Sequence, residues 1–176
     1  MPRPSWDEYF MMLAKLAASR STCVSRPTGA VIVKDRQMIA TGYNGSLPSQ
    51  PHCIDEGKCF RRSLSWPESV KYDMCRSAHA ESNAIALAAK KGMPVEGATI
   101  YCTLEPCITC TKLIIMSGIM RIVYEHGYDS PMPQRDEHWK KVLKSSGAKV
   151  EHLAFNGKVA RFAMEFLKED TSKRRV

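Results

Sequence analysis

Short apolar runs alternate with helical patterns along this chain, and that alternation restricts its fold more than any other feature. A capping box at Ser5 and Glu8 opens a helix that runs to about residue 20. Strands are predicted at 29–33, 38–43, 98–103, 121–124 and 149–153, and further helices at 78–91, 107–117, 136–146 and 158–167. We therefore expect a layered α/β fold with helices packed on a five-stranded sheet.

The chain of 176 residues has no internal repeat, low-complexity tract or linker, so we expect a single domain over residues 1–176. The segment from about 45 to 77 has no periodicity and is rich in Ser, Pro and Cys. It is longer than an ordinary loop in a compact domain. We expect this cysteine-rich insertion to be held by something other than a hydrophobic core.

Charge and hydropathy limit the partners. No apolar run approaches the ~20 residues that span a bilayer, and the N-terminus has no apolar signal core, so we expect a cytoplasmic protein without a membrane partner. The formal net charge of +8 suits either nucleic acid or a substrate that carries phosphate. Because part of the charge lies in the tail at 171–176 and both signs are interleaved elsewhere, we do not expect a nucleic-acid partner.

The seven cysteines include two in a short metal-binding pattern. An odd number does not suit a closed disulfide framework, and clustered cysteines near a histidine indicate metal in a reducing compartment. His79, Cys107 and Cys110 are the candidate ligands, because a catalytic zinc takes three protein ligands and leaves one position for water. The start of a helix also favours negative charge, which helps to keep both sulfurs as thiolates.

Glu81 is the candidate catalytic residue, since it follows His79 by two positions and could reach a water molecule on the metal. Zinc makes hydroxide available near neutral pH, and a carboxylate can move the proton to a ring nitrogen and then to departing ammonia. His-x-Glu followed by Pro-Cys-x-x-Cys is the known pattern of zinc-dependent nucleobase deaminases. Alone, Cys-x-x-Cys could be a redox pair or half of a structural zinc site, and His-x-Glu two surface residues. Their order and helix-opening positions favour the catalytic interpretation.

A second, structural zinc is predicted from four other cysteines that bracket the insertion: Cys23, Cys53, Cys59 and Cys75. Four thiolates make a closed tetrahedral site, which would stabilise a segment with little core of its own. His52 could replace one cysteine, and the alternative is four unrelated buried thiols. Cys102 lies in a predicted strand, where a small buried residue is expected.

From about residue 5 to residue 153 the chain resembles the deoxycytidylate (dCMP) deaminases of the cytidine deaminase superfamily. The resemblance rests on Thr28-Gly29-Ala30, Gly42-Tyr43-Asn44-Gly45, the motifs at 79–85 and 106–110, Ser117-Gly118-Ile119 and Tyr128-Asp129. It implies a three-layer α-β-α cytidine-deaminase-like fold with a five-stranded mixed sheet. It also implies deamination of dCMP to dUMP with release of ammonia, which feeds thymidylate synthesis.

The resemblance implies partners and further site residues as well. Family members are typically homo-oligomers, often hexamers, activated by dCTP with Mg²⁺ and inhibited by dTTP, and phage and bacterial members carry a second zinc in the insertion. The implied substrate contacts are Asn44 at the sugar or base edge, Ala80, and Tyr128 near the 5′-phosphate. Asn44 could instead serve only the turn, because Asn-Gly is a common turn pair, and Tyr128 could be an ordinary loop aromatic.

One departure leaves the base open. Glu105 precedes Pro106, where dCMP deaminases more often have Ser-Pro-Cys, and Glu-Pro-Cys is similar to tRNA adenosine deaminases or guanine deaminases. Those relatives usually lack the cysteine-bearing insertion and the Gly-Tyr-Asn-Gly loop, so dCMP is the expected substrate. A non-enzyme alternative is a zinc-containing RNA-binding module, which would have no use for the proton carrier Glu81.

Overall fold

The structure is a computed structural model that describes residues 3–67, 70, 73–127 and 133–168. Its main sheet has the strand order β2-β1-β5-β6-β7. These strands are β1 (Gly29–Lys34), β2 (Gln37–Tyr43), β5 (Thr99–Leu104), β6 (Arg121–His126) and β7 (Lys149–His152). β1 is antiparallel to β2 and to β5, whereas β5, β6 and β7 are parallel. The sheet is therefore mixed and five-stranded, as predicted.

Both faces of the central strands are covered, so β1 and β5 are nearly continuous apolar runs. Alternate residues face opposite sides of the sheet and form two separate cores. One core contains Ala30, Ile32, Ala84, Ile100, Ile114 and Ile122. The other contains Phe10, Met11, Ala14, Val31, Tyr101 and Val123.

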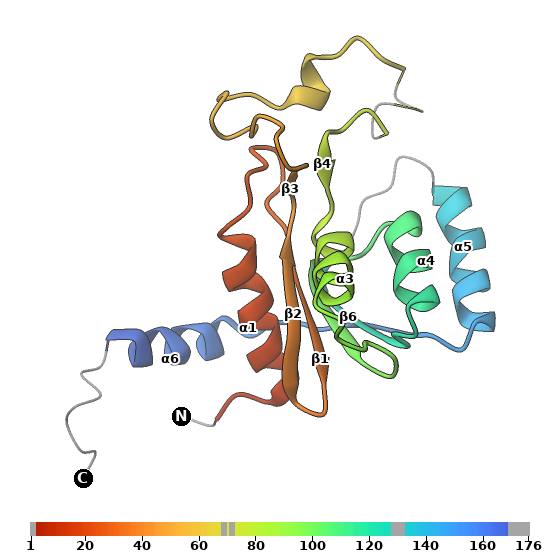
Figure 1. Cartoon of the computed structure of the whole chain (residues 1–176). Coiled ribbons are helices and arrows are strands. Elements are labelled where there is room, and N and C mark those ends of the chain that lie inside the picture. The colour runs from red at the N-terminus through yellow and green to blue at the C-terminus, as the bar shows by residue number, and fades with distance from the viewer. Residues whose placement is uncertain (1–2, 68–69, 71–72, 128–132, 169–176) are drawn as a thin grey trace.

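Helices on the two faces complete the three-layer arrangement (Figure 1). α1 (Trp6–Ala18) covers one face, and α3 (Ala80–Lys90) and α4 (Ile108–Met116) cover the other, with α5 (Pro133–Ser145) beyond α4. The predicted capping box opens α1: the Ser5 N–H donates to Glu8 Oε2 at 2.8 Å, and the Glu8 N–H donates to Ser5 Oγ at 3.3 Å. The three-layer prediction is confirmed.

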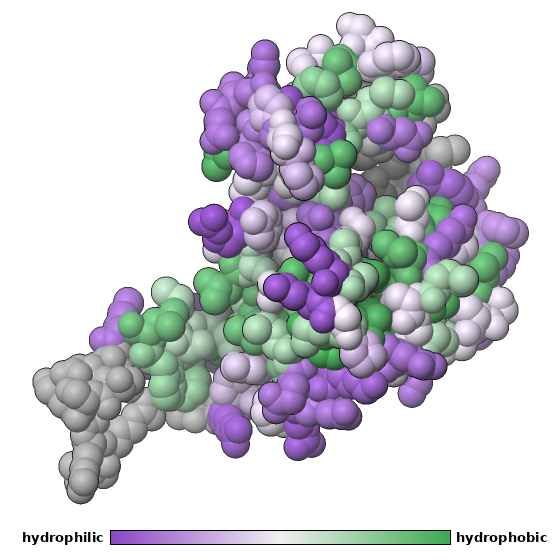
Figure 2. Space-filling model, in the orientation of Figure 1, coloured by the Kyte–Doolittle hydropathy of each residue, from purple (hydrophilic) through white to green (hydrophobic). Residues whose placement is uncertain are grey.

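The last helix, α6 (Gly157–Lys168), lies beyond α1 and buries none of its residues. Figure 2 shows hydrophobic residues gathered over it, and they include Met164 and Leu167. None of the helices in the described parts of the chain combines the length and apolar character needed to cross a bilayer.

The insertion contains regular structure that the sequence pattern did not predict. β3 (Gly45–Ser46) pairs antiparallel with β4 (Ser77–Ala78), and a short 3₁₀ helix, η1, covers Phe60–Ser63. Because residues 77 and 78 belong to this pairing, the helix predicted from residue 78 begins at Ala80. The two-stranded pairing closes the insertion at its base.

Candidate active site

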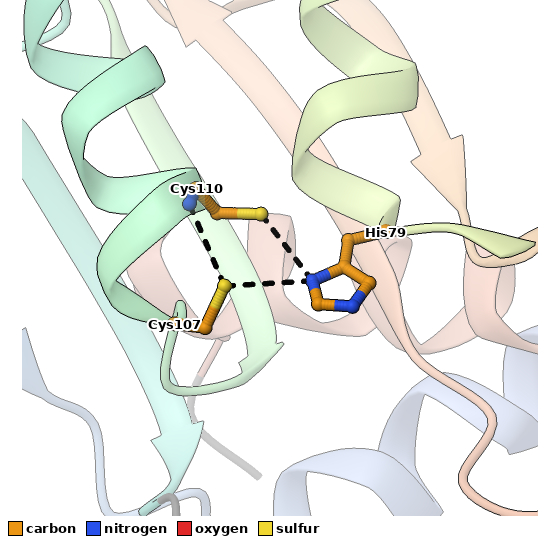
Figure 3. Close-up of side chains that lie close together, drawn as sticks. All are labelled: His79, Cys107 and Cys110. Atoms are coloured by element: carbon orange, nitrogen blue, oxygen red, sulfur yellow. Dashed lines mark hydrogen bonds between the residues drawn. The ribbon is translucent and has the colours of Figure 1, made fainter. Parts of the chain in front are cut away.

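Two helix starts carry the candidate metal ligands. His79 is the N-cap residue of α3, Cys107 is the N-cap residue of α4, and Cys110 lies in the first turn of α4. The loop that leads to α4 follows the carboxyl end of β5, the edge of an α/β sheet where ligands commonly bind. The side chains point toward one another between the two helices (Figure 3).

The spacing of the three ligand atoms suits a tetrahedral zinc. His79 Nδ1 lies 3.6 Å from Cys107 Sγ and 3.4 Å from Cys110 Sγ. Zinc bonds of ~2.3 Å to sulfur and ~2.0 Å to nitrogen place tetrahedral sulfur and nitrogen ligands ~3.5 Å apart. Among the described residues, this is the only group of three His, Cys, Asp or Glu ligand atoms within 4.8 Å of one another. The donor set and its geometry therefore fit zinc.

The two thiols differ in proton affinity. A hydrogen bond from the Cys110 thiol lowers the pKa of Cys107 to about 4, with help from His79 and the Cys110 backbone N–H. The same hydrogen bond, together with burial, raises the pKa of Cys110. The hydrogen bond to Cys107 also raises the pKa of His79. These shifts favour a thiolate at Cys107 over one at Cys110, and zinc, which takes both sulfurs as thiolates, would displace the remaining thiol proton when it binds.

Glu81 lies in the first turn of α3, with only 7% of its surface exposed. Burial raises the pKa of its carboxyl group, and a side-chain hydrogen bond with Cys110 opposes that shift. A carboxyl group whose pKa is raised holds a proton more readily, so it can both accept a proton and return it. Its position next to the three ligands suits a proton carrier.

Two of the three implied substrate contacts, Asn44 and Ala80, are among the described residues. Asn44 is buried at the end of β2, and Ala80 is buried at the start of α3, directly after His79. A Cβ added to Gly42 would lie 2.1 Å from the Ala80 carbonyl oxygen, so β2 and α3 are in close backbone contact here. Tyr128 and Asp129 lie outside the described residues.

The four cysteines of the predicted structural site are all described, and all are free thiols. No three of their sulfurs belong to the kind of close ligand group that His79, Cys107 and Cys110 form. Their neighbours are nevertheless linked. The Ile54 N–H donates to the Thr22 carbonyl oxygen at 3.1 Å, and Arg76 contacts both the Cys53 sulfur and the Phe60 ring.

A cavity of about 440 Å³ lies on the α1 side of the carboxyl ends of β5 and β6. Its lining includes Arg26, Thr28, Thr103 and an ion pair in which Lys15 Nζ lies 2.6 Å from Glu125 Oε1. The sequence analysis missed these residues, because α1, the segment before β1 and the end of β6 meet only in the folded chain. No local pattern marks them.

Comparisons with known proteins agree with this geometry. The family model "Cytidine and deoxycytidylate deaminase zinc-binding region" matches residues 4–126. Deoxycytidylate deaminase of Saccharomyces cerevisiae is 42% identical over 153 residues, which are 87% of this chain and 46% of the yeast protein. The chain thus spans about half the length of that relative. Deoxycytidylate deaminase of Mycobacterium phage D29 is 43% identical over 129 residues, covering 70% of this chain and 97% of the phage protein.

A solved structure shares the fold. The crystal structure of dCMP deaminase from the cyanophage S-TIM5, in complex with dCMP and dUMP, superposes with a TM-score of 0.67 at 27% identity. The match covers 87% of this chain and 100% of the cyanophage chain. The resemblance drawn from the sequence is confirmed, and the chain belongs to the zinc-binding cytidine and deoxycytidylate deaminase family.

Proposed function

We propose that this protein catalyses the zinc-dependent hydrolysis of dCMP to dUMP and ammonia, a reaction that feeds thymidylate synthesis. The observation that carries the proposal is the buried carboxyl group of Glu81 beside the ligand set of His79, Cys107 and Cys110. The relatives named deoxycytidylate deaminase supply the choice of substrate.

The residues divide the chemical work. His79, Cys107 and Cys110 would hold the zinc, which when bound is a Lewis acid that makes hydroxide available near neutral pH. Glu81 accepts a proton from the attacking water and passes it to the ring nitrogen of cytosine. Once the water oxygen is bonded to C4, Glu81 takes the proton of that new hydroxyl group and delivers it to the amino group. The C4–N bond then breaks and C4=O forms, so that one water is consumed and one ammonia is released. Burial suits Glu81 to this exchange, because it raises the pKa of the carboxyl group.

The 5′-phosphate is proposed to bind at the cavity beside β5 and β6, where Arg26 supplies positive charge. Lys15 also lines this cavity, but both oxygens of Glu125 already engage its ammonium group, at 2.6 and 2.7 Å. Leu104, another lining residue, is three positions before Cys107, so the cavity adjoins the loop that leads to the metal ligands. Arg26 is therefore the cation that we assign to the phosphate, together with the implied contact from Tyr128.

Ammonia release from a substrate panel tests the proposal. The panel holds dCMP, CMP, dCTP, deoxycytidine, guanine and an adenosine-bearing tRNA stem-loop. Charge-assisted hydrogen bonds to phosphate can each contribute a few kcal/mol, so kcat/KM for deoxycytidine should be lower than for dCMP by roughly two to four powers of ten. Reaction of deoxycytidine within about threefold of dCMP would contradict the nucleotide assignment. Reaction of guanine or of the tRNA stem-loop alone would make Glu105 the better guide to the substrate.

A charge-removing variant separates phosphate recognition from chemistry. Arg26→Ala should lower kcat/KM for dCMP by at least about tenfold and leave that for deoxycytidine unchanged. Arg36→Ala is the matched control, because Arg36 lies in the turn between β1 and β2, at the other end of β1. Equal losses on both substrates would remove Arg26 from the phosphate site.

We also propose that the chain is one domain over residues 1–176 and that Cys23, Cys53, Cys59 and Cys75 bind a structural zinc. Two backbone links support this second site. The hydrogen bond between Ile54 and Thr22 brings the segments of Cys53 and Cys23 together, and the β3–β4 pairing holds the start of the insertion beside the segment of Cys75. His52 is the alternative ligand.

Assembly and regulation are proposed on the family resemblance. We propose a homo-oligomer, for which the resemblance implies a hexamer. Apolar side chains that α3 and α4 leave exposed, including Leu87, Leu113 and Met116, support self-association. We also propose activation by dCTP with Mg²⁺ and inhibition by dTTP. The rate of dCMP turnover, measured as each nucleotide is added, should rise with dCTP and fall with dTTP. All seven cysteines are free thiols, which suits the reducing cytoplasm.

A further inference from the structure

The side chain of Asn44 is hydrogen-bonded to the segment that joins α1 to β1. Asn44 Oδ1 accepts hydrogen bonds from the Thr28 N–H at 2.9 Å and the Ser21 hydroxyl at 2.6 Å, and Asn44 Nδ2 donates to the Arg26 carbonyl oxygen at 2.9 Å. The Asn44 backbone adds its own bonds to Thr28 and Thr22, both at 3.2 Å. These contacts involve three of the four hydrogen bonds that an amide side chain can make.

This pattern is not ordinary turn chemistry. In a turn, an asparagine side chain commonly bonds to backbone about two residues farther on. The partners of the Asn44 side chain are instead 16, 18 and 23 residues away along the chain. Asn44 has only 9% of its surface exposed, and its side chain links the end of β2 to residues 21–28 by long-range hydrogen bonds.

The strand end that carries Asn44 is itself fixed to the helix that carries Glu81. Asn83, in α3, donates from Nδ2 to the Tyr43 carbonyl oxygen at 2.8 Å. The close approach of Gly42 to the Ala80 carbonyl leaves no space for a side chain between β2 and α3. Asn44 is therefore held at a set position relative to the candidate active site.

Two of the residues that the Asn44 side chain bonds to, Arg26 and Thr28, line the cavity assigned to the phosphate. The next residue, Gly29, donates from its N–H to Thr103 Oγ1 at 3.0 Å, which fixes the start of β1 against β5. Between Ser21 and Gly29, Asn44 donates to the carbonyl oxygen of Arg26 and bonds to Ser21 and Thr28 on either side of it, so these bonds help to fix where the Arg26 backbone lies.

We propose that Asn44 is a positioning residue that holds residues 21–28 against the end of β2 and so preforms the wall of the nucleotide cavity. It acts on phosphate binding through Arg26, whose carbonyl group it holds. Naming dCMP as the ligand rests on the proposed function, whereas the hydrogen bonds between Asn44 and residues 21–28 do not depend on it.

Hydrogen exchange and kinetics on the zinc-loaded full chain test this role. In Asn44→Ala, amide exchange at residues 22–29 should be at least about tenfold faster, because the Thr28 N–H loses its acceptor and the segment loses the side-chain bonds that restrict its opening, while α3 keeps its protection. KM for dCMP should rise at least about tenfold and kcat should stay within about threefold, since the proton carrier is untouched.

Two milder variants keep the test valid if Asn44→Ala does not fold. Asn44→Asp retains both acceptor roles, loses the donor to Arg26 and adds a negative charge, so it is compared by exchange in the ligand-free protein, where residues 22–29 should again exchange faster. Ser21→Ala removes a single hydroxyl and should give smaller changes in exchange and in KM in the same direction. Ser46→Ala is the matched control, because its hydroxyl donates to the Pro51 carbonyl oxygen outside this network. It should change neither exchange at 22–29 nor KM.

Two results would overturn the proposal. Unchanged exchange at residues 22–29 together with a raised KM would show that Asn44 acts by contacting the substrate directly. Faster exchange with an unchanged KM would show that the segment does not shape the cavity. If the wild-type protein does not deaminate dCMP, the proposed function fails, while exchange in the ligand-free protein still decides whether Asn44 holds the segment.

Discussion

Glu81 and Glu125 are the buried acidic residues of the described chain, and Glu125 is paired with Lys15, whereas Glu81 lies beside the candidate metal ligands. Its carboxyl group is 7% exposed, and burial raises its pKa, so the group is suited to hold a proton that a surface glutamate would release. Glu81→Gln keeps the size and removes the proton exchange. Turnover should fall by at least 10²–10⁴-fold, the usual contribution of a general acid–base group, with zinc still bound. Ammonia release and metal analysis on the same sample measure both quantities.

Glu137→Gln, on the exposed side of α5, is the control for Glu81→Gln and should leave turnover unchanged. A zinc-replete Glu81→Gln protein with near-wild-type turnover would remove Glu81 from the mechanism. Loss of zinc together with activity would make Glu81 part of the metal site.

At the scale of elements, α1 packs against β1 without space for a side chain between them. A Cβ at Gly29 would lie 2.1 Å from the Ala14 carbonyl oxygen and 2.5 Å from the Ala18 nitrogen, both backbone atoms that cannot move alone. Gly29→Ala should therefore lower the free energy of unfolding by at least the ~1–3 kcal/mol typical of overpacking. Urea unfolding measures the loss, and Gly157→Ala, which meets no atom within 4 Å, is the control. Equal stability of the two variants would contradict the close packing.

The start of α1 is joined to the sheet by ion pairs that acid should weaken. Arg121 Nη1 and Nη2 donate to the two carboxylate oxygens of Asp7 at 2.9 and 2.8 Å, and Nη2 also donates to Glu151 at 2.7 Å. The hydrogen bonds from Arg121 hold the pKa of Asp7 below its usual value. The stabilisation is present above the unfolded-state pKa of ~3.9 and is lost as pH falls through the lower folded-state pKa.

Asp7→Asn should accordingly lower the urea midpoint at pH 7, and the difference from wild type should shrink as the pH falls below about 4. The effect is modest, because 35% of the Asp7 side chain is exposed and solvent screens the pair. Asp35→Asn, in the turn between β1 and β2, is the control. A difference that grows in acid would have the wrong sign for this ion pair.

For the whole molecule, metal content tests whether the insertion has its own zinc. Protein purified without chelator should contain about two zinc ions per chain, one held by His79, Cys107 and Cys110 and one held by the four cysteines that bracket the insertion. A Cys53→Ser Cys75→Ser double variant should retain one zinc and its catalytic ligands, whereas Cys102→Ala, which changes a buried core cysteine in β5, should retain two. One zinc per chain in the wild type, unchanged in the double variant, would remove the structural site.

Local patterns in the sequence were enough to predict the five strands of the main sheet, the helices between them and the candidate metal ligands. Period-two and period-3.6 apolar patterns reflect burial on one face of a strand or helix, and Cys107 and Cys110 lie within one helical turn. The start of α3 was placed two residues too early, because β4 pairs with β3, more than thirty residues before it. No local periodicity in 45–77 records that pairing.

The sequence by itself thus determined the layered fold and the family, and it predicted the group of His79, Cys107, Cys110 and Glu81, because all of these depend on short spacings along the chain. Only the tertiary structure brought Asn44 to residues 21–28 and Asp7 to Arg121. Each of these contacts joins residues that are far apart in the chain, and their positions depend on how α1 packs across the sheet. Hydrogen bonds between such partners have no sequence period, since the packing of the whole domain decides which groups meet.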